Sequence, residues 1–226
     1  MMKAHSAILA AAAGAALLMV GGCTSPSATT SPSASVSVAT SPASPTAPAP
    51  SAPVTPPADY TMVTAAANKI HVPLPADLDV LDPSQVNVSP DMQQNFADMA
   101  QKLGMTVDDL QQQIANLDLY AVDSSTNNVN IMQPLPGVGT TLDEVQPSLE
   151  NIGATDITSR DAAAPTGPAL VVAYTLTNND VTMNGTQLYV QTDTMTTTVI
   201  TITGVTWTAD QVSQMADIML AGIQHV

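Results

Sequence analysis

Residues 169–203, ALVVAYTLTNNDVTMNGTQLYVQTDTMTTTVITIT, have the clearest strand pattern of this chain. They hold three segments rich in Val, Ile, Thr and Tyr, which favour strands: Ala169–Thr177, Thr186–Asp193 and Met195–Thr203. Turn-forming residues separate these segments at Asn178–Asp180, Asn184–Gly185 and Asp193–Thr194. The stretch therefore predicts an antiparallel meander.

A helix is expected directly after this meander. Thr208 and Gln211 have the spacing of a capping box, in which each side chain bonds the backbone N–H of the other residue. Apolar residues then recur at helical spacing: Val212, Met215, Ala216, Met219, Leu220 and Ile223. Such an apolar face has to be buried, so we expect this helix to pack on the sheet.

Helices and short strands alternate ahead of the meander. We expect strands at Lys69–Pro75, Leu119–Asp123 and Asn128–Met132, and helices at Pro90–Leu103, from Thr106 onward and from Thr141 to near Gly153. Asp109 and Glu144 each lie three residues after a threonine, which is the spacing of a capping box. Pro147 lies inside the third helix, so we expect a kink or a late start there.

This order of elements predicts an α+β fold, with an antiparallel sheet flanked by helices. The residues that follow one another here resemble the PsbP-like fold, to which actinobacterial lipoproteins of the LpqN type are similar. The resemblance rests on Leu119–Asp123, Asn128–Ile131, Leu149–Ala154, Gly167–Ala169, Val171–Tyr174, the Tyr189 and Thr196–Thr203 strands and the last helix. It implies an accessory or partner-binding protein, not an enzyme.

The first residues have the layout of a bacterial lipoprotein signal. Lys3 precedes an apolar stretch of about 13 residues, which is too short to span a membrane as a helix. Val20, Gly21 and Gly22 then form a lipobox ahead of Cys23. We expect residues 1–22 to be a signal peptide, removed by cleavage before Cys23. An ordinary secretory signal with a coincidental cysteine is the alternative.

Resemblance to bacterial lipoproteins implies a thioether-linked diacylglycerol on Cys23, with acyl chains such as palmitate. Two acyl chains hold a protein on a membrane durably, whereas a single chain binds only marginally. We therefore expect the protein at the extracytoplasmic face of the cell membrane. Cys23 is the only cysteine, so the rest of the chain has neither a disulfide nor a thiol nucleophile.

Residues 23–58 and 59–226 differ sharply in composition. After Cys23 the first segment is almost entirely Ser, Thr, Pro, Ala and Val, which predicts a disordered linker that serves as a spacer or as a simple tether. The second predicts one α+β globular domain. It holds all 19 acidic residues against Lys69, Lys102 and Arg160, a net charge of −16. Nucleic acid is therefore a poor partner, because proteins bind it through Lys and Arg.

No residue pattern indicates catalysis, a metal or a cofactor. His71 and His225 have no neighbours at the spacing of metal ligands. Asp77, Asp79 and Asp82 could bind calcium, but a solvated acidic turn is the simpler interpretation. Trp207, Phe96 and the methionines at 92, 99, 105, 215 and 219 are expected in the core, with an adaptable ligand groove as the alternative.

These observations favour a non-catalytic accessory protein that binds another protein of the cell envelope. A carrier of a small apolar molecule or lipid is the alternative, and it requires an open cavity of about 300 Å³ or more. An enzyme would need carboxylates from distant positions to converge in a cleft.

We predict that Cys23→Ser abolishes anchoring, because serine has no thiol to accept the lipid. The variant should be released to the medium or retained as the uncleaved precursor. Membrane fractionation and the intact mass of the protein measure both effects. Unchanged mass and unchanged membrane retention in the variant would contradict the lipobox.

Overall fold

The computed structural model describes residues 55–81, 93–94, 97–98, 100–101, 106–136, 141–178, 181–193 and 195–226. The signal peptide, the lipobox, Cys23 and the linker up to residue 54 lie outside the described residues. The helix expected at Pro90–Leu103 lies largely outside them too. Within the described part of the chain, no helix is both long enough and apolar enough to cross a membrane.

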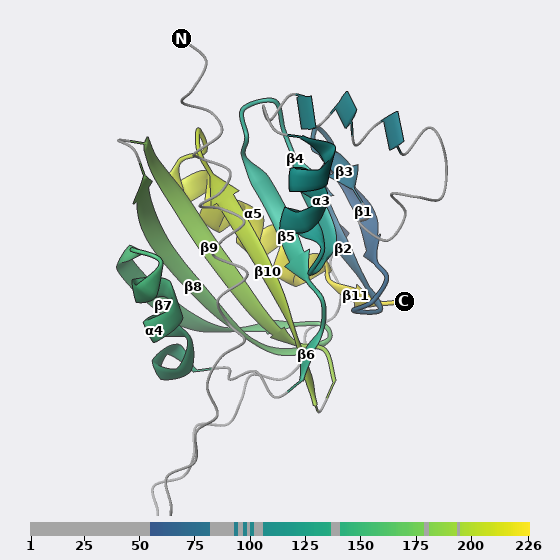
Figure 1. Cartoon of the computed structure of the whole chain (residues 1–226). Coiled ribbons are helices and arrows are strands. Elements are labelled where there is room, and N and C mark those ends of the chain that lie inside the picture. Colours follow the sequence, from purple (N-terminus) through teal and green to yellow (C-terminus); the bar gives the residue numbers. More distant parts are fainter. Residues whose placement is uncertain are drawn as a thin grey trace, which may run out of the picture.

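A large antiparallel sheet forms the centre of the molecule (Figure 1). Along its path the strands follow the order β3-β4-β5-β10-β9-β8-β7, and β6 pairs with β10 beside this path. The bounds are β3 Asp79–Leu81, β4 Leu117–Val122, β5 Asn128–Met132, β6 Leu135–Pro136, β7 Thr155–Ala164, β8 Gly167–Asn178, β9 Val181–Gln191 and β10 Thr196–Gly204. The meander expected from the sequence is thus confirmed as β8, β9 and β10.

A second, three-stranded sheet has the order β1-β2-β11. Its strands are β1 Tyr60–Ala65, β2 Ile70–Pro75 and β11 Gln224–His225. β1 and β2 form a hairpin, and β11 adds the end of the chain to the other side of β2. The first and last described strands therefore both pair with β2.

Three helices complete the elements that are fully described, α3 Val107–Ile114, α4 Leu142–Asn151 and α5 Ala209–Gly222. Each begins after the threonine that the sequence predicts as its N-cap. The Thr106 hydroxyl accepts the Asp109 N–H at 3.1 Å, and the Thr208 hydroxyl accepts the Gln211 N–H at 3.3 Å. At α4 the Glu144 carboxylate accepts the Thr141 N–H at 3.2 Å. The three capping boxes are confirmed.

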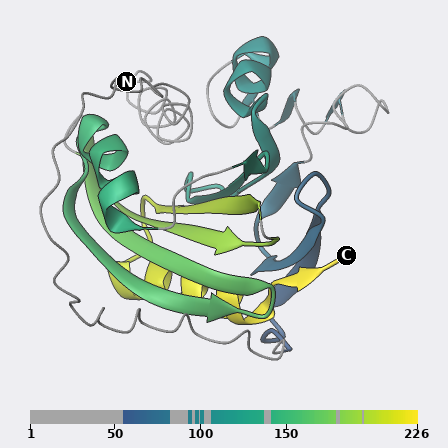
Figure 2. The same ribbon diagram turned by 90° about the horizontal axis from the view of Figure 1, so that it is seen from below.

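The two faces of the large sheet pack against different elements (Figure 2). Leu110 and Ile114 of α3 and Val145 and Leu149 of α4 join the hydrophobic cluster on one face. α5 and the β1–β2 hairpin supply the cluster on the other face, where Met215 and Met219 are buried. The α+β class with helices flanking an antiparallel sheet is confirmed.

Asn184–Gly185 is not a turn, contrary to the expectation from the sequence. Both residues lie inside β9, where Gly185 pairs with Tyr174 of β8. A Cβ atom on Gly185 would lie 2.3 Å from the Tyr174 ring. The glycine is therefore needed because the buried ring crosses the strand at this point, and not because the backbone turns.

One further expectation needs correction. α4 begins at Leu142, ahead of Pro147, because the Thr141–Glu144 capping box fixes its first turn; the expected late start was wrong.

The strand β7 has no recognisable pattern in the sequence, because it has mostly exposed side chains and forms an edge of the large sheet. An edge strand facing solvent lacks the apolar alternation by which strands are recognised.

A buried polar network joins the two sheets. The Asp118 carboxylate accepts the backbone N–H groups of Ala67 and Asn68, at 3.0 and 2.9 Å, and the Asn68 side-chain amide at 2.8 Å. That amide also donates to the Met132 carbonyl at 2.7 Å, and its oxygen accepts the Thr198 hydroxyl at 2.7 Å. The turn of the β1–β2 hairpin is thereby fixed to β4, β5 and β10.

We predict that Asp118→Ala lowers the free energy of unfolding by about 3 kcal/mol, because it leaves buried N–H donors without an acceptor. Urea unfolding followed by circular dichroism measures the change. Asp161→Ala is the control, since Asp161 is an exposed residue of β7. Equal stability of the two variants would contradict the structural role of Asp118.

Candidate functional site

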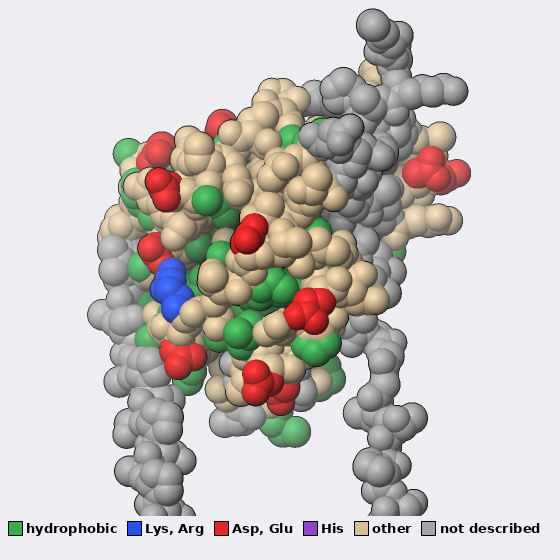
Figure 3. Space-filling view, turned by 90° about the vertical axis from the view of Figure 1, so that its left-hand side faces the viewer, with side chains coloured by type: hydrophobic (Ala, Val, Ile, Leu, Met, Phe, Trp, Pro, Cys, Tyr) green, Lys and Arg blue, Asp and Glu red, His purple; other side chains and the backbone are tan. Residues whose placement is uncertain are grey.

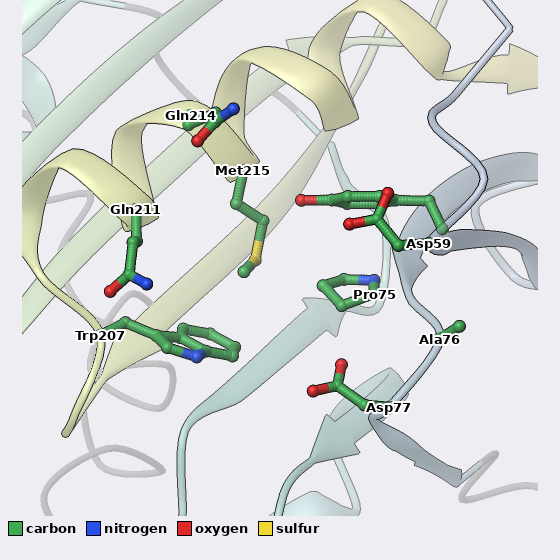
Figure 4. A pocket seen from close by; sticks show the side chains of 9 residues that line it. Asp59, Pro75, Ala76, Asp77, Trp207, Gln211, Gln214 and Met215 are labelled. Atoms are coloured by element: carbon green, nitrogen blue, oxygen red, sulfur yellow. The ribbon is translucent and has the colours of Figure 1, made fainter.

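A pocket of about 390 Å³ lies between the end of the β1–β2 hairpin and the start of α5 (Figure 4). We call it the Asp59–Trp207 pocket. Its lining residues come from two distant parts of the chain: Asp59, Tyr60, Pro75, Ala76 and Asp77 from the hairpin side, and Trp207, Gln211, Gln214 and Met215 from the α5 side.

Backbone pairing sets the hairpin wall of the pocket. Tyr60 is the first residue of β1 and lies opposite Pro75, the last residue of β2. Beyond this pair, the Ala76 N–H donates to the Asp59 carbonyl at 2.9 Å. The register therefore holds Asp59 and Asp77 at the same end of the hairpin, although 17 positions separate them in the sequence.

The side chain of Asn127 fixes the segment that carries Trp207. Its oxygen accepts the N–H groups of Val205 and Thr206, both at 2.8 Å, and that of Trp207 at 3.4 Å. The Trp207 carbonyl accepts the Asn184 amide at 2.9 Å. Asn127 is only 1% exposed. The backbone that carries the half-buried Trp207 side chain is therefore held by Asn127, next to β5, and by Asn184 of β9.

The close view shows how the two walls face each other (Figure 4). The Met215 side chain extends from α5 toward the Trp207 indole, and both face Pro75 across the pocket. The Asp77 carboxylate points into the space between Pro75 and Trp207, and the Asp59 carboxylate lies on the other side of Pro75. Apolar and aromatic groups thus form the walls, with carboxylates on the hairpin side.

The pocket has a negative potential. Burial raises the pKa of the Tyr60 phenol, and the Asp59 and Asp77 carboxylates raise it further. Among the residues that the structure describes, no lysine or arginine lines the pocket. Acidic side chains are also spread over the left-hand side of the molecule as drawn in Figure 1, where Figure 3 shows only a small basic patch. The Asp59–Trp207 pocket would therefore repel an anionic ligand.

The structure brings together three residues that the sequence singled out for separate reasons. Asp77 was a candidate for a solvated or calcium-binding turn, and Trp207 and Met215 were candidates for the core or a ligand groove. All three line the Asp59–Trp207 pocket. Asp79 opens β3 instead, Met219 is fully buried, and Asp82, Phe96 and the methionines at 92, 99 and 105 lie outside the described residues.

Reactive clusters are absent from the described residues. No three His, Cys, Asp or Glu side chains in this part of the chain come close enough to hold a metal ion. His71 lies on β2, where its Nδ1 is 3.0 Å from the Thr64 hydroxyl, and His225 is exposed on β11. Neither histidine lines the Asp59–Trp207 pocket.

Buried polar side chains also form a row across the large sheet. Thr201 of β10 pairs with Asn130 of β5 on one side and with Gln187 of β9 on the other. Each is at most 2% exposed, and they lie on the same face of the sheet as Val199, which belongs to the hydrophobic cluster of α3 and α4. Within the described residues, the Asn130 Oδ1 and Thr201 Oγ1 atoms have no hydrogen-bond partner. Sequence reasoning missed this row.

Comparisons with known proteins give a likeness in fold. No family model matches the chain, and no curated protein matches it in sequence. Among solved structures, the chain is similar to the solution structure of cyanobacterial PsbP (CyanoP) from Synechocystis sp. PCC 6803, at 10% identity and a TM-score of 0.44. The likeness covers 78% of this chain and 98% of that one. It says nothing of what this chain binds.

We predict that Asn127→Ala loosens the Trp207 wall and lowers the free energy of unfolding by about 2 kcal/mol, because three N–H groups lose their acceptor. Trp207 is the only tryptophan, so its fluorescence reports on the pocket directly. We expect its emission to shift to longer wavelength as water reaches the indole. Asn151→Ala, at the exposed end of α4, is the control and should leave the emission unchanged.

Proposed function

We propose that this chain is a lipid-anchored accessory protein of the cell envelope, which binds a partner protein and is not an enzyme. The observation that carries the proposal is the Asp59–Trp207 pocket. It is open to solvent and has walls fixed by backbone pairing and by Asn127. Its described lining combines aromatic, apolar and polar groups, as binding sites do, and no histidine, cysteine or serine stands among these described lining residues.

The position of the pocket along the chain supports the same proposal. Asp59 lines the pocket and is the first residue after the expected linker of residues 23–58. A partner bound there would be held beside the point from which the linker leads back to Cys23. Anchoring at Cys23 and binding at the pocket would then keep the partner near the membrane.

The proposal is tested with the full chain, tagged after Ser51 and purified in detergent from the membranes of its host. We expect one envelope protein to copurify with the wild type and to be lost from the Trp207→Ala variant. Met195→Ala is the matched control, because Met195 is 77% exposed and does not line the pocket. Equal recovery of the partner from all three proteins, or from none, would contradict binding at this pocket.

A carrier of a small apolar molecule or lipid is the second candidate. The unpartnered Asn130 and Thr201 oxygens favour it, because a buried polar row beside an apolar cluster suits a molecule with one polar group. Solvent extraction of the purified full chain and mass spectrometry would detect such a molecule. A lipid lost on Thr201→Val, without any copurified protein, would favour the carrier.

A further inference from the structure

We propose that the Asp59–Trp207 pocket binds the guanidinium group of an arginine side chain that the partner protein presents. This inference rests on the proposed function, since it names the chemistry by which the partner is recognised. Three features of the pocket carry it: its charge, its aromatic walls and the fixed positions of both.

The charge of the pocket selects a cation. Asp59 and Asp77 supply two carboxylates from one end of the hairpin, and no basic residue of the described lining neutralises them. Burial, and then these two carboxylates, raise the pKa of the Tyr60 phenol, which also lines the pocket. The large excess of acidic side chains in residues 59–226 adds attraction at longer range.

The opposite wall does not favour an anion, although it contains the start of a helix. The first turn of α5 carries Asp210, which offsets the positive end of the helix dipole. Two N–H groups at this end are already bonded, because the Thr208 N–H donates to the Gln211 side chain at 2.9 Å and the Gln211 N–H donates to the Thr208 hydroxyl. Because the start of α5 is capped, the Asp59 and Asp77 carboxylates dominate the charge of the pocket.

The aromatic walls suit a guanidinium better than a small inorganic cation. Trp207 and Tyr60 present rings to the pocket, and a planar guanidinium stacks on aromatic faces while it donates hydrogen bonds to carboxylates in its own plane. Met215 and Pro75 add apolar surface that can cover the methylene groups of the side chain. A metal ion would instead need oxygen ligands on all sides.

The rigidity of the pocket lowers the entropy cost of binding. The Tyr60–Pro75 pairing fixes the backbone of the hairpin wall, and Asn127 fixes the backbone segment of Trp207. Its volume of about 390 Å³ exceeds what one side chain fills, so neighbouring residues of the partner also have room. Binding groups held in place before the ligand arrives lose little freedom when it binds.

The test uses the full chain in detergent and the fluorescence of Trp207, the only tryptophan. The probe is the peptide acetyl-Gly-Arg-Gly-amide, and the matched control peptide has citrulline, a neutral group of the same shape, in place of arginine. At constant ionic strength, we expect a saturable change with the arginine peptide and at least a tenfold weaker response to the citrulline peptide.

Variants of the chain show where the arginine peptide binds. We expect Asp59→Asn and Asp77→Asn each to weaken binding of the arginine peptide by about threefold to fivefold, as for single exposed ion pairs. Tyr60→Leu should weaken it by a similar factor, because it removes one stacking surface. Asp161→Asn changes the net charge equally but lies on β7, outside the pocket, and should bind as the wild type does.

The inference is overturned by equal responses to the two peptides, by no saturable response, or by equal losses in Asp161→Asn and Asp59→Asn. A response to spermidine with none to the arginine peptide would also overturn it and would make a free polyamine the ligand. Lysine in place of arginine should bind more weakly. If the arginine peptide does not bind while the Trp207-dependent partner still copurifies, only the assignment of arginine is contradicted. If the peptide binds and no partner copurifies, the proposed function is contradicted instead.

Discussion

The Asp118 carboxylate ties the β1–β2 hairpin to the large sheet through its hydrogen bonds to the turn at Ala67 and Asn68. The β1–β2 hairpin belongs to a separate sheet and has no backbone pairing with the large one. Packing alone would allow it to slide, because apolar contacts have little directional preference. The buried network fixes its position relative to β4, β5 and β10, and thereby fixes where its open end lies.

The Asp59–Trp207 pocket follows from that position. α5 packs on β2, and Gly222 lies so close to Pro73 that a Cβ atom there would be 2.7 Å from the proline ring. The helix therefore crosses the hairpin at a fixed place, with its first turns beside Pro75. The two walls of the pocket are more than 125 positions apart in the sequence. They meet because the Asp118 network fixes the position of the hairpin and the Gly222–Pro73 contact fixes the position of α5.

Sequence reasoning recovered the elements whose signals are local. The meander, the three capping boxes and the apolar face of α5 follow from residues a few positions apart, and all are confirmed. Sequence reasoning failed where a residue far away in the sequence determines the local structure. Gly185 is a glycine because of Tyr174 on another strand, and β7 has few apolar residues because it is an edge. The pocket could not be predicted either: Asp77 and Trp207 each stood out, but their meeting depends on Asp118 and Asn127, which only tertiary structure reveals.

The direction in which the chain enters β1 gives the molecule a mechanical property. The segment ahead of Tyr60 joins the hairpin at its open end, where Tyr60 pairs with Pro75, while the Asp118 network holds the closed end beyond Ala65. A pull on that segment, directed away from β2, would separate the pairs one at a time from Tyr60 onward. The first pair to open supplies two lining residues of the pocket. Tension would therefore open the Asp59–Trp207 pocket before it unfolds the large sheet.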